Sequence, residues 1–486
     1  MVSSVNEKLL DERLPRLEQA RAWSPRVISK LESHIRSADD DALFRINPLS
    51  FGNEKNIAEN EAIDLLLHAT AVGLFSMDWH LLCSACSCVV ESFRSLKGVH
   101  NQFHCNVCTM DYEASLDDLI SVTFTINPQI RDIELLHPEH LSAWDYFFKF
   151  GGTTDGRLPD GTPFVNVQQS VTKAVTYLPP GETTRIEIEA NEGTVVGGSM
   201  EGKAAFLFHI DPEATPLTQM FPIAFGDTKV SDHDTKTIAP GRMIFEIQNT
   251  TSERGTFLLA LLPKEIEYGH VSVTFAPFLT GKRLLTSQTF RELFRSEVIK
   301  ASEGIGVRKI TLLFTDLKGS TALYDRIGDL NAFSLVQQHF DRLQDVTVRH
   351  NGAVIKTIGD AVMAAFLNPR DAVRAAIAMR KEIADFNRDK PDRELILKIG
   401  LHSGAAIAVT LNDRLDYFGP TANIAARVQS LADADEIYIS DDVYVAQGVQ
   451  AELQDYKVSE QLATLKGIRD DMRVHCVRSS TGRAAA

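Results

Sequence analysis

From residue 306 onward, apolar strand-like runs alternate with amphipathic helical segments, and this alternation limits the possible folds more than any other feature. The expected strands are residues 309–317, 352–358, 361–366, 395–404 and 436–440. The expected helices are residues 330–350, 369–386 and 421–432, and the polar segment 412–419 is expected to be a loop. Alternating elements of this kind predict a sheet covered on one face by helices.

Before residue 306, the pattern of apolar and polar residues changes several times along the chain. This fits a chain of 486 residues, which is long enough for two to four domains. In one stretch, short alternating runs such as FVNVQQSV (164–171) and RIEIEA (185–190) are separated by Gly/Pro turns, which predicts an antiparallel β-sandwich or barrel. The expected order is a helical segment at 1–80, a zinc-ribbon-like segment at 81–126, a β-rich domain at 127–282, a connecting helix and hinge at 283–305, the α/β region at 306–478 and a disordered tail at 479–486. The expected fold class is therefore multidomain α+β.

The connecting segment carries apolar residues on one side of a helix expected over 284–299. These residues are Leu284, Phe290, Leu293, Phe294 and Val298. The face could pair with its twin in a second copy of the chain or pack into the core of its own chain, and the spacing fits both.

Two acidic residues follow or join predicted strands of the α/β region. Asp316 comes at the end of an apolar strand and before a Gly-Ser turn that opens a helix. Asp360 lies in a tight turn between two strands. Each acid alone is more simply an ordinary turn residue, but two acids at neighbouring strand ends can share two divalent cations. The pair therefore predicts a metal site.

A third motif runs from Asp416 to Arg427. Asn423 and Arg427 are four residues apart on a predicted helix, so both side chains project from one face. Arginine suits the negative charge that develops on a phosphoryl group. A solvated polar stripe is the simpler interpretation, but the small apolar residues between the two indicate a helix that packs against a partner.

In combination, these motifs resemble the catalytic domain of the class III nucleotidyl cyclases over residues 306–478. The resemblance implies that Asp316 and Asp360 bind two Mg²⁺ or Mn²⁺ ions per active site, and that Asn423 and Arg427 orient the ribose and stabilise the transition state. It also implies that Lys466 contacts the terminal phosphates, although a surface lysine fits that position nearly as well. The family's sites form between two catalytic domains, so this chain, with one such domain, is expected to be a homodimer.

The base specificity can be argued from Lys356 and Asp416, which match the family's adenine-selecting pair. Adenine offers a ring nitrogen that accepts and an exocyclic amine that donates, which complement an ammonium and a carboxylate. Guanine offers the reverse polarity and is selected in this family by Glu with Cys or Ser. The expected reaction is conversion of ATP to 3′,5′-cyclic AMP and pyrophosphate. A guanylyl cyclase, or a degenerate cyclase domain that acts as a nucleotide sensor, is the alternative.

Five of the six cysteines lie within residues 83–108. The pairs Cys83/Cys86 and Cys105/Cys108 have the spacing of a structural Zn²⁺ site with four thiolates, against the alternative of unrelated buried or redox cysteines. Cys88 and His104 are the nearest competing ligands. Residues 45–280 also resemble the N-terminal region of some bacterial cyclases, for which no ligand can be named. We expect this region to regulate or scaffold the cyclase in response to an unknown ligand or protein.

Composition argues against two further classes of function. A net charge of −15 disfavours nucleic-acid binding, including a DNA-binding role for the zinc-ribbon-like segment. The apolar runs are too short to span a bilayer and the first residues do not read as a signal peptide, so no membrane association is expected. A cytoplasmic location is expected.

Overall fold

The computed structural model describes residues 3–107, 110–117, 119–201, 205–226, 234–264, 273–300, 303–388 and 395–479. The chain forms two compact units. The first comprises Met1–Arg94, Asn101–Ala114 and Asp118–Thr280, and the second comprises Ser95–His100, Ser115–Asp117 and Gly281–Ala486.

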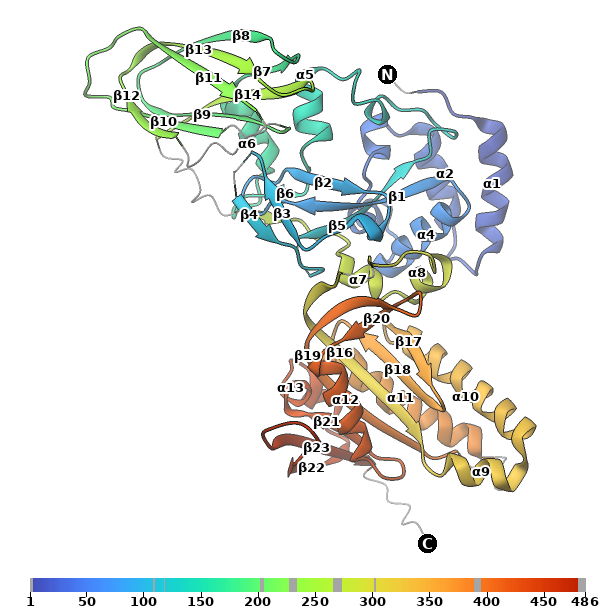
Figure 1. Cartoon of the computed structure of the whole chain (residues 1–486). Helices are drawn as coiled ribbons and strands as arrows, with labels where there is room; N and C mark the ends of the chain where they lie inside the picture. Colours follow the sequence, from blue (N-terminus) through green and yellow to red (C-terminus); the bar gives the residue numbers. More distant parts are fainter. Residues whose placement is uncertain are drawn as a thin grey trace. The chain divides into compact units, whose positions relative to one another are not determined.

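The first unit begins with four helices whose apolar faces are buried. These are α1 (Glu7–Gln19), α2 (Val27–Ser37), α3 (Pro48–Lys55) and α4 (Glu59–Ala71), with the short 3₁₀ helix η1 (Asp40–Leu43) between α2 and α3. Of these, α1, α2 and α4 are labelled in Figure 1. Asn6 caps α1 because its side chain accepts a hydrogen bond from the backbone N–H of Leu9 at 3.2 Å. In α4, Leu65, Leu66 and Leu67 are fully buried, as expected of a core helix.

A three-stranded antiparallel sheet follows, in the order β2-β1-β5. Its strands are β1 (Phe75–Leu82), β2 (Val89–Phe93) and β5 (Ile120–Ile126), and a hairpin of β3 (Gln102–Cys105) and β4 (Met110–Glu113) lies between β2 and β5 in sequence. The next short elements are η3 (Glu134–Leu136), α5 (Ala143–Asp145), the π-helical turn η4 (Tyr146–Phe150) and β6 (Gly156–Arg157), which pairs with β15 (Thr274–Phe275).

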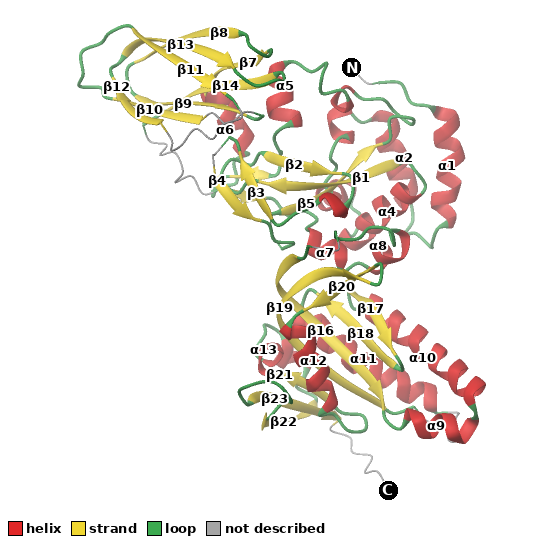
Figure 2. Ribbon diagram, viewed as in Figure 1, coloured by secondary structure: helices red, strands yellow, loops and turns green. Residues whose placement is uncertain are grey.

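The β-rich part is a sandwich of two sheets (Figure 2). Buried phenylalanines form much of the core between them. One sheet has the order β12-β10-β9-β14-β7 and the other β11-β13-β8. The strands are β7 (Thr172–Leu178), β8 (Thr183–Ala190), β9 (Gly193–Ser199), β10 (Ala205–Ile210), β11 (Gln219–Phe225), β12 (Asp234–Ile238), β13 (Gly241–Asn249) and β14 (Gly255–Leu262). The predicted sandwich is therefore present, but two strand pairs, β10–β12 and β11–β13, are parallel.

The run FVNVQQSV, which we expected to be a strand, is the helix α6 (Phe164–Val171). Its apolar residues satisfy both periods, because Phe164, Val167 and Val171 also recur at helical spacing. The expectation was wrong because a short apolar run does not distinguish the two periods.

The second unit is built on one large sheet with the order β17-β18-β16-β19-β21-β23-β22, to which β20 adds by pairing with β19. The strands are β16 (Ile305–Leu317), β17 (Gly352–Ile358), β18 (Ala361–Phe366), β19 (Leu397–Leu411), β20 (Arg414–Phe418), β21 (Ile437–Ser440), β22 (Tyr456–Ala463) and β23 (Met472–Ser479). The helices are α7 (Gly281–Leu285), α8 (Gln288–Leu293), α9 (Ser320–Ile327), α10 (Asp329–Arg349), α11 (Pro369–Asn387), α12 (Pro420–Ser430), α13 (Asp441–Tyr444) and α14 (Val449–Glu452), with the 3₁₀ turn η2 (Leu96–Gly98) also in this unit.

Helices cover both faces of this sheet, not the single face that we expected. Along β21, Ile437 and Ile439 belong to the core beneath α10 and α11, whereas Tyr438 belongs to a second core beneath α12. Because successive side chains of a strand point to opposite faces, these two cores lie on the two sides of the sheet. Figure 1 shows α10 and α11 beside β17 and β18.

Three other expectations are corrected within the second unit. The helix expected over 284–299 is two short helices, α7 and α8, separated where Ser287 caps α8 through the N–H of Phe290 at 3.3 Å. The expected loop 412–419 contains the strand β20. Ser479 ends β23, and the remainder of the expected tail, 480–486, lies outside the described residues.

Two short pieces of the N-terminal sequence belong to the second unit. Asp117 accepts hydrogen bonds from the N–H of Arg308 and from Nζ of Lys282, both at 2.7 Å. Glu297 accepts from the N–H of Leu96 at 2.7 Å.

Among the described residues, no helix has the length and apolar character that a membrane span requires.

One buried arginine ties together the helical part of the first unit. Arg131 is fully buried and donates to the backbone carbonyls of Ile35 (2.8 Å) and Ala38 (2.7 Å) and to the carboxylate of Asp40 (2.6 Å). Burial would raise the pKa of Asp40, but the hydrogen bonds from Ser3 and Arg131 lower it below its usual value. The ion pair is therefore complete at neutral pH and is lost as the pH falls through the lowered pKa.

Replacing this residue should destabilise the first unit strongly. We expect Arg131→Gln to cost about 3 kcal/mol, because two buried carbonyls lose their donor and the Asp40 carboxylate loses its ion-pair partner and keeps only the hydrogen bonds from Ser3. Arg16→Gln is the matched control, since the exposed pair of Arg16 with Glu12 is worth at most about 0.5 kcal/mol. Calorimetry of the full chain should resolve the difference, and equal unfolding temperatures in the two variants would contradict it.

Candidate active site

The first predicted acid, Asp316, lies at the end of β16, the strand between β18 and β19. The apolar residues before it are buried, and Gly319 follows with a φ of 73°, a left-handed conformation that glycine adopts without strain before α9 begins. Asp316 is half-buried and lies opposite Lys398 of β19, with Oδ2 and Nζ 4.0 Å apart.

The second predicted acid, Asp360, is held in the turn between β17 and β18, where Gly359 has a φ of 63°. Thr315 ties this turn to β16, because its Oγ1 accepts a hydrogen bond from the N–H of Val362 at 3.1 Å. Burial and the negative charge of Asp360 both raise the pKa of Asp316, as expected where two carboxylates face each other. The structure therefore brings the two acids together.

These two carboxylates fit a divalent cation. Oδ2 of Asp360 is buried and has no hydrogen-bond partner among the residues that the structure describes. A buried carboxylate oxygen without a donor, facing a second carboxylate, is costly unless a cation neutralises it. Oxygen ligands of this kind suit Mg²⁺ or Mn²⁺.

A buried histidine that we did not single out from the sequence lies near Asp360. His339 of α10 is fully buried, and neither ring nitrogen bonds to any described residue. Burial lowers the pKa of His339 to about 4, against the opposing charge of Asp360, so the imidazole is neutral at pH 7. The sequence could have indicated this burial, because His339 lies on the same apolar face of α10 as Leu335 and Leu343.

The predicted base-binding residues, Lys356 and Asp416, form an ion pair. Lys356 is on β17, and Asp416 is on β20, the strand that replaces the expected loop. Asp416 is 6% exposed and also accepts a hydrogen bond from the N–H of Tyr417 at 2.8 Å, whereas Lys356 is 36% exposed. The buried carboxylate thus holds the more accessible ammonium in place.

Helix α8 contacts both strands that carry this ion pair. The side-chain oxygen of Gln288 accepts from the N–H of Val354 in β17 at 2.9 Å. Arg291 donates to the carbonyl of Leu415, the neighbour of Asp416 in β20. Burial lowers the pKa of Arg291, and Tyr417 and Asp416 oppose that shift. These positioning contacts come from distant parts of the sequence, so no local motif pointed to them.

Asn423 and Arg427 lie on α12, as predicted. Ala425 and Val428 are fully buried on the inner face, whereas Asn423 is exposed and Arg427 is partly exposed. Neither of these two side chains bonds to another described residue. Both are therefore available to a ligand.

Lys466 is exposed in the loop between β22 and β23, and its side chain bonds to no described residue. Its neighbour Gly467 lies beside Arg427, since Nη2 of Arg427 is 3.5 Å from the place that a Cβ on Gly467 would take. The structure thus brings the loop of Lys466 next to Arg427.

The cysteine cluster is a separate site in the first unit. The sulfur atoms of Cys83, Cys86 and Cys105 lie within 4.8 Å of one another and are buried. Cys108 lies outside the described residues. Of the two competing ligands, Cys88 is buried near the cluster, and His104 bonds to Asp111 at 2.9 Å. Three converging thiols fit a Zn²⁺ ion that takes a fourth ligand.

Two family models match the chain over adjacent stretches. The model described as a family of unknown function, DUF5939, matches residues 11–292. The model described as the adenylate and guanylate cyclase catalytic domain matches residues 305–479. The second unit thus carries a cyclase catalytic domain.

The similar proteins include adenylate cyclases, each of which matches less than half of this chain. Adenylate cyclase 2 of Rhizobium meliloti (strain 1021) is 32% identical over 130 residues, which are 24% of this chain and 36% of that protein. The pH-sensitive adenylate cyclase MT1302 of Mycobacterium tuberculosis (strain CDC 1551 / Oshkosh) is 28% identical over 203 residues, which are 40% of this chain and 49% of that protein. The chain thus spans less than half the length of these curated relatives. The crystal structure of the adenylyl cyclase CyaB from P. aeruginosa is 22% identical, with a TM-score of 0.32 over 38% of this chain and 100% of that chain.

The repulsion between the two acids gives a measurable effect on stability. Because the pKa of Asp316 is raised in the folded state, ionisation of Asp316 destabilises the second unit as the pH rises. In EDTA at pH 7, we expect Asp360→Asn to stabilise this unit, because it removes the negative charge that opposes ionisation of Asp316. Mn²⁺ should stabilise the parent protein more than the variant.

Asp385→Asn is the control, since Asp385 pairs with Arg388 on the surface. It should change neither the stability in EDTA nor the response to Mn²⁺. Thermal unfolding by calorimetry measures both quantities, and an Asp360→Asn protein that is less stable in EDTA, or equally stabilised by Mn²⁺, would refute the metal site.

Proposed function

Because the chain belongs to the family of unknown function DUF5939 and carries an adenylate and guanylate cyclase catalytic domain, we propose that it is an adenylate cyclase that converts ATP to 3′,5′-cyclic AMP and pyrophosphate. The observation that carries the choice of substrate is the Lys356–Asp416 ion pair. The ammonium can donate to a ring nitrogen of adenine, and the carboxylate can accept from the exocyclic amine. Guanine would place an acceptor before Asp416 and donors before Lys356, leaving both charges unsatisfied.

The remaining residues supply positioning and charge, which are what an intramolecular phosphoryl transfer requires. Asp316 and Asp360 would hold two Mg²⁺ or Mn²⁺ ions, whose charge lowers the pKa of the ribose 3′-hydroxyl and neutralises the triphosphate. Asn423 would orient the ribose, and Arg427 would stabilise the charge that develops at the α-phosphate. Lys466, beside Arg427, would bind the terminal phosphates.

We infer that the active site is completed by a second copy of the chain. In the family that the motifs resemble, the metal-binding acids come from one domain, and the base-binding and transition-state residues come from the other. The surface next to Asp416 supports an interface, since Ile407 and Phe418, paired across β19 and β20, are 43% and 61% exposed. Large exposed apolar side chains of this kind are typical of surfaces that a partner covers.

We also propose that Cys83, Cys86, Cys105 and Cys108 hold a structural Zn²⁺ and that residues 11–292 regulate or scaffold the cyclase. Three buried sulfur atoms that converge within 4.8 Å support the zinc site. A tetrahedral site of four thiolates has no open position, so the ion would stabilise the fold and take no part in catalysis.

The activity is tested directly with ATP and GTP, each with Mg²⁺ or Mn²⁺, using purified full-length protein. We expect cyclic AMP as the preferred product, and a loss of at least about a hundredfold in Asp316→Ala and Asp360→Ala. Asp385→Ala, a surface acid of the same unit, should keep its activity. Preferential formation of cyclic GMP would refute the substrate assignment, and no product with either metal would favour a degenerate domain that acts as a nucleotide sensor.

Exchanging the polarity of the base site tests the specificity residues. The double variant Lys356→Glu and Asp416→Cys should lower the ratio of kcat/KM for ATP to that for GTP, because the new pair matches the guanine edge. The fall in selectivity for ATP is the expected result even where activity with GTP stays low. An unchanged ratio would remove both residues from the base site.

The zinc proposal predicts one zinc ion per chain by elemental analysis of the purified protein. Cys105→Ser should lose the ion and increase proteolysis within the first unit, since the metal holds the knuckles of the ribbon together. Cys476→Ser is the control, because Cys476 is a buried cysteine of β23 in the second unit. A zinc-free parent protein, or equal zinc content in both variants, would contradict the site.

A further inference from the structure

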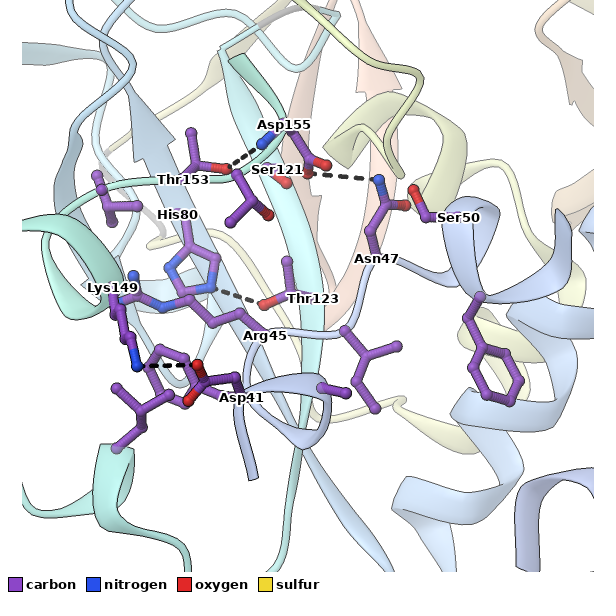
Figure 3. Close-up of a pocket in the computed structure, with 18 of the residues that line it drawn as sticks. Asp41, Arg45, Asn47, Ser50, His80, Ser121, Thr123, Lys149, Thr153 and Asp155 are labelled. Carbon is purple, nitrogen blue, oxygen red and sulfur yellow. Dashed lines mark hydrogen bonds and ion pairs between the residues drawn. The ribbon is translucent and has the colours of Figure 1, made fainter. Parts of the chain in front are cut away.

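The first unit contains a polar cavity of about 350 Å³ that no part of the proposed activity uses. It is lined by the segment from η1 to α3, by the C-terminal half of β1 and the N-terminal half of β5, and by residues within 149–157. Figure 3 shows six of its charged or polar side chains, Asp41, Arg45, Asn47, His80, Lys149 and Asp155, pointing into one space. Cavities of this size are typical of small-molecule sites.

Arg45 is held in the cavity wall by its own backbone and by aromatic contacts. Its φ of 50° is a left-handed conformation that is uncommon for arginine, and its N–H donates to Oγ1 of Thr125 at 3.1 Å. The guanidinium lies over the rings of Phe44 (4.8 Å) and Phe150 (5.1 Å). The side chain therefore has a fixed position before any ligand arrives.

The charge of Arg45 is not neutralised by an ion pair. The guanidinium donates to the backbone carbonyl of Phe150 and to Oγ of Ser92 at 3.5 Å, and it pairs with no carboxylate of the described residues. Burial lowers the pKa of Arg45 to about 10, with Asp78 opposing the shift, so the group stays protonated at neutral pH. A partly buried guanidinium that forms no ion pair with a described carboxylate can still bind an anionic ligand.

The neighbouring polar groups leave Arg45 as the charge that this end of the cavity offers. His80 is 3% exposed and bonds through Nδ1 to Ser92 and through Nε2 to Thr123, both at 2.8 Å. Burial lowers the pKa of His80 well below its usual value, so the ring is neutral. At the rim, Lys149 pairs with Asp41 at 2.9 Å and with Asp145 at 3.3 Å, so its charge is already neutralised.

The other end of the cavity offers hydrogen-bonding groups. Asn47 donates from Nδ2 to the carbonyl of Pro277 at 2.9 Å and lies 3.4 Å from Oδ2 of Asp155. Burial raises the pKa of Asp155, and Asn47 and Arg157 oppose this shift. The Asp155 carboxyl therefore has capacity left for a hydroxyl or amino group.

We propose that this cavity binds a small organic anion, with its carboxylate or phosphate group against Arg45 and its hydroxyl or amino groups against Asn47 and Asp155. The fixed guanidinium supplies two parallel donors for a carboxylate or phosphate. The polar end then selects anions that carry a second polar group over simple inorganic ions. The DUF5939 region is thus a ligand-binding unit. On the proposed function, the bound anion would be the signal that regulates cyclase activity.

The test is calorimetric titration of the full-length protein at constant ionic strength, without nucleotide or divalent metal. Glycerol 3-phosphate and malate represent the phosphate and carboxylate classes, inorganic phosphate lacks the second polar group, and glycerol lacks the anion. We expect saturable 1:1 binding of at least one organic anion, weaker binding of inorganic phosphate and no binding of glycerol. The stronger of the two organic anions identifies the class.

Three variants of cavity residues and one surface control make the result specific to the cavity. Arg45→Gln should weaken anion binding by about tenfold or more. Arg45→Lys keeps the positive charge and should weaken binding less, so it remains informative if Arg45→Gln disturbs the fold. Asp155→Asn should reduce the advantage of the organic anion over inorganic phosphate, and Arg242→Gln, on the surface of the sandwich, should change nothing. No saturable binding of any anion, equal affinity in Arg45→Gln, or an equal loss in Arg242→Gln would overturn the proposal. Because nucleotide and metal are absent, these outcomes are independent of the cyclase assignment.

Discussion

The proximity of two carboxylates, Asp316 and Asp360, is the constraint on which the catalytic unit depends. Both acids are fixed by strand ends, and the hydrogen bond from Val362 to Thr315 keeps the β17–β18 turn against β16. Burial and mutual repulsion raise the pKa of Asp316, and one oxygen of Asp360 has no donor among the described residues. Lys398 offsets this repulsion only in part, since the pKa of Asp316 is raised all the same, and a bound cation would relieve it further. This is the arrangement that a metal-dependent phosphoryl transfer requires.

The ion pair that we propose for base binding depends on a different set of contacts. Lys356 and Asp416 lie on separate strands, and α8 contacts both strands through Gln288 and Arg291. Helix α8 lies inside the DUF5939 match, which ends at residue 292, yet it belongs to the second unit. The segments 95–100 and 115–117 belong to that unit as well. The DUF5939 match therefore includes residues that contact the two strands of the Lys356–Asp416 pair.

Much of the catalytic unit could be predicted from the sequence because its strands are apolar and its acids follow strand ends. β16, β17, β18 and the long helices α10 and α11 occur where the hydrophobic period indicated. The strand β20 was missed because its pairing with the extension of β19 is set by distant residues, and α6 was assigned to the wrong class because its apolar residues fit two periods. His339 and Arg291 were missed because their importance comes from burial next to residues far away in sequence. Cys108, the fourth proposed zinc ligand, lies outside the described residues, so that ligand set stays a prediction.

The most direct test of a site shared between two chains is complementation between inactive variants. Asp360→Ala and Arg427→Ala should each be inactive alone. In a mixed heterodimer, one site carries both defects and the other carries neither, so an equal mixture should recover about a quarter of the parent activity. A mixture of Asp316→Ala with Asp360→Ala is the control, since both sites of that heterodimer keep a defect in the metal-binding half and should stay inactive. Recovery in the first mixture alone is the expected result, and no recovery in a demonstrably mixed dimer would contradict the shared site.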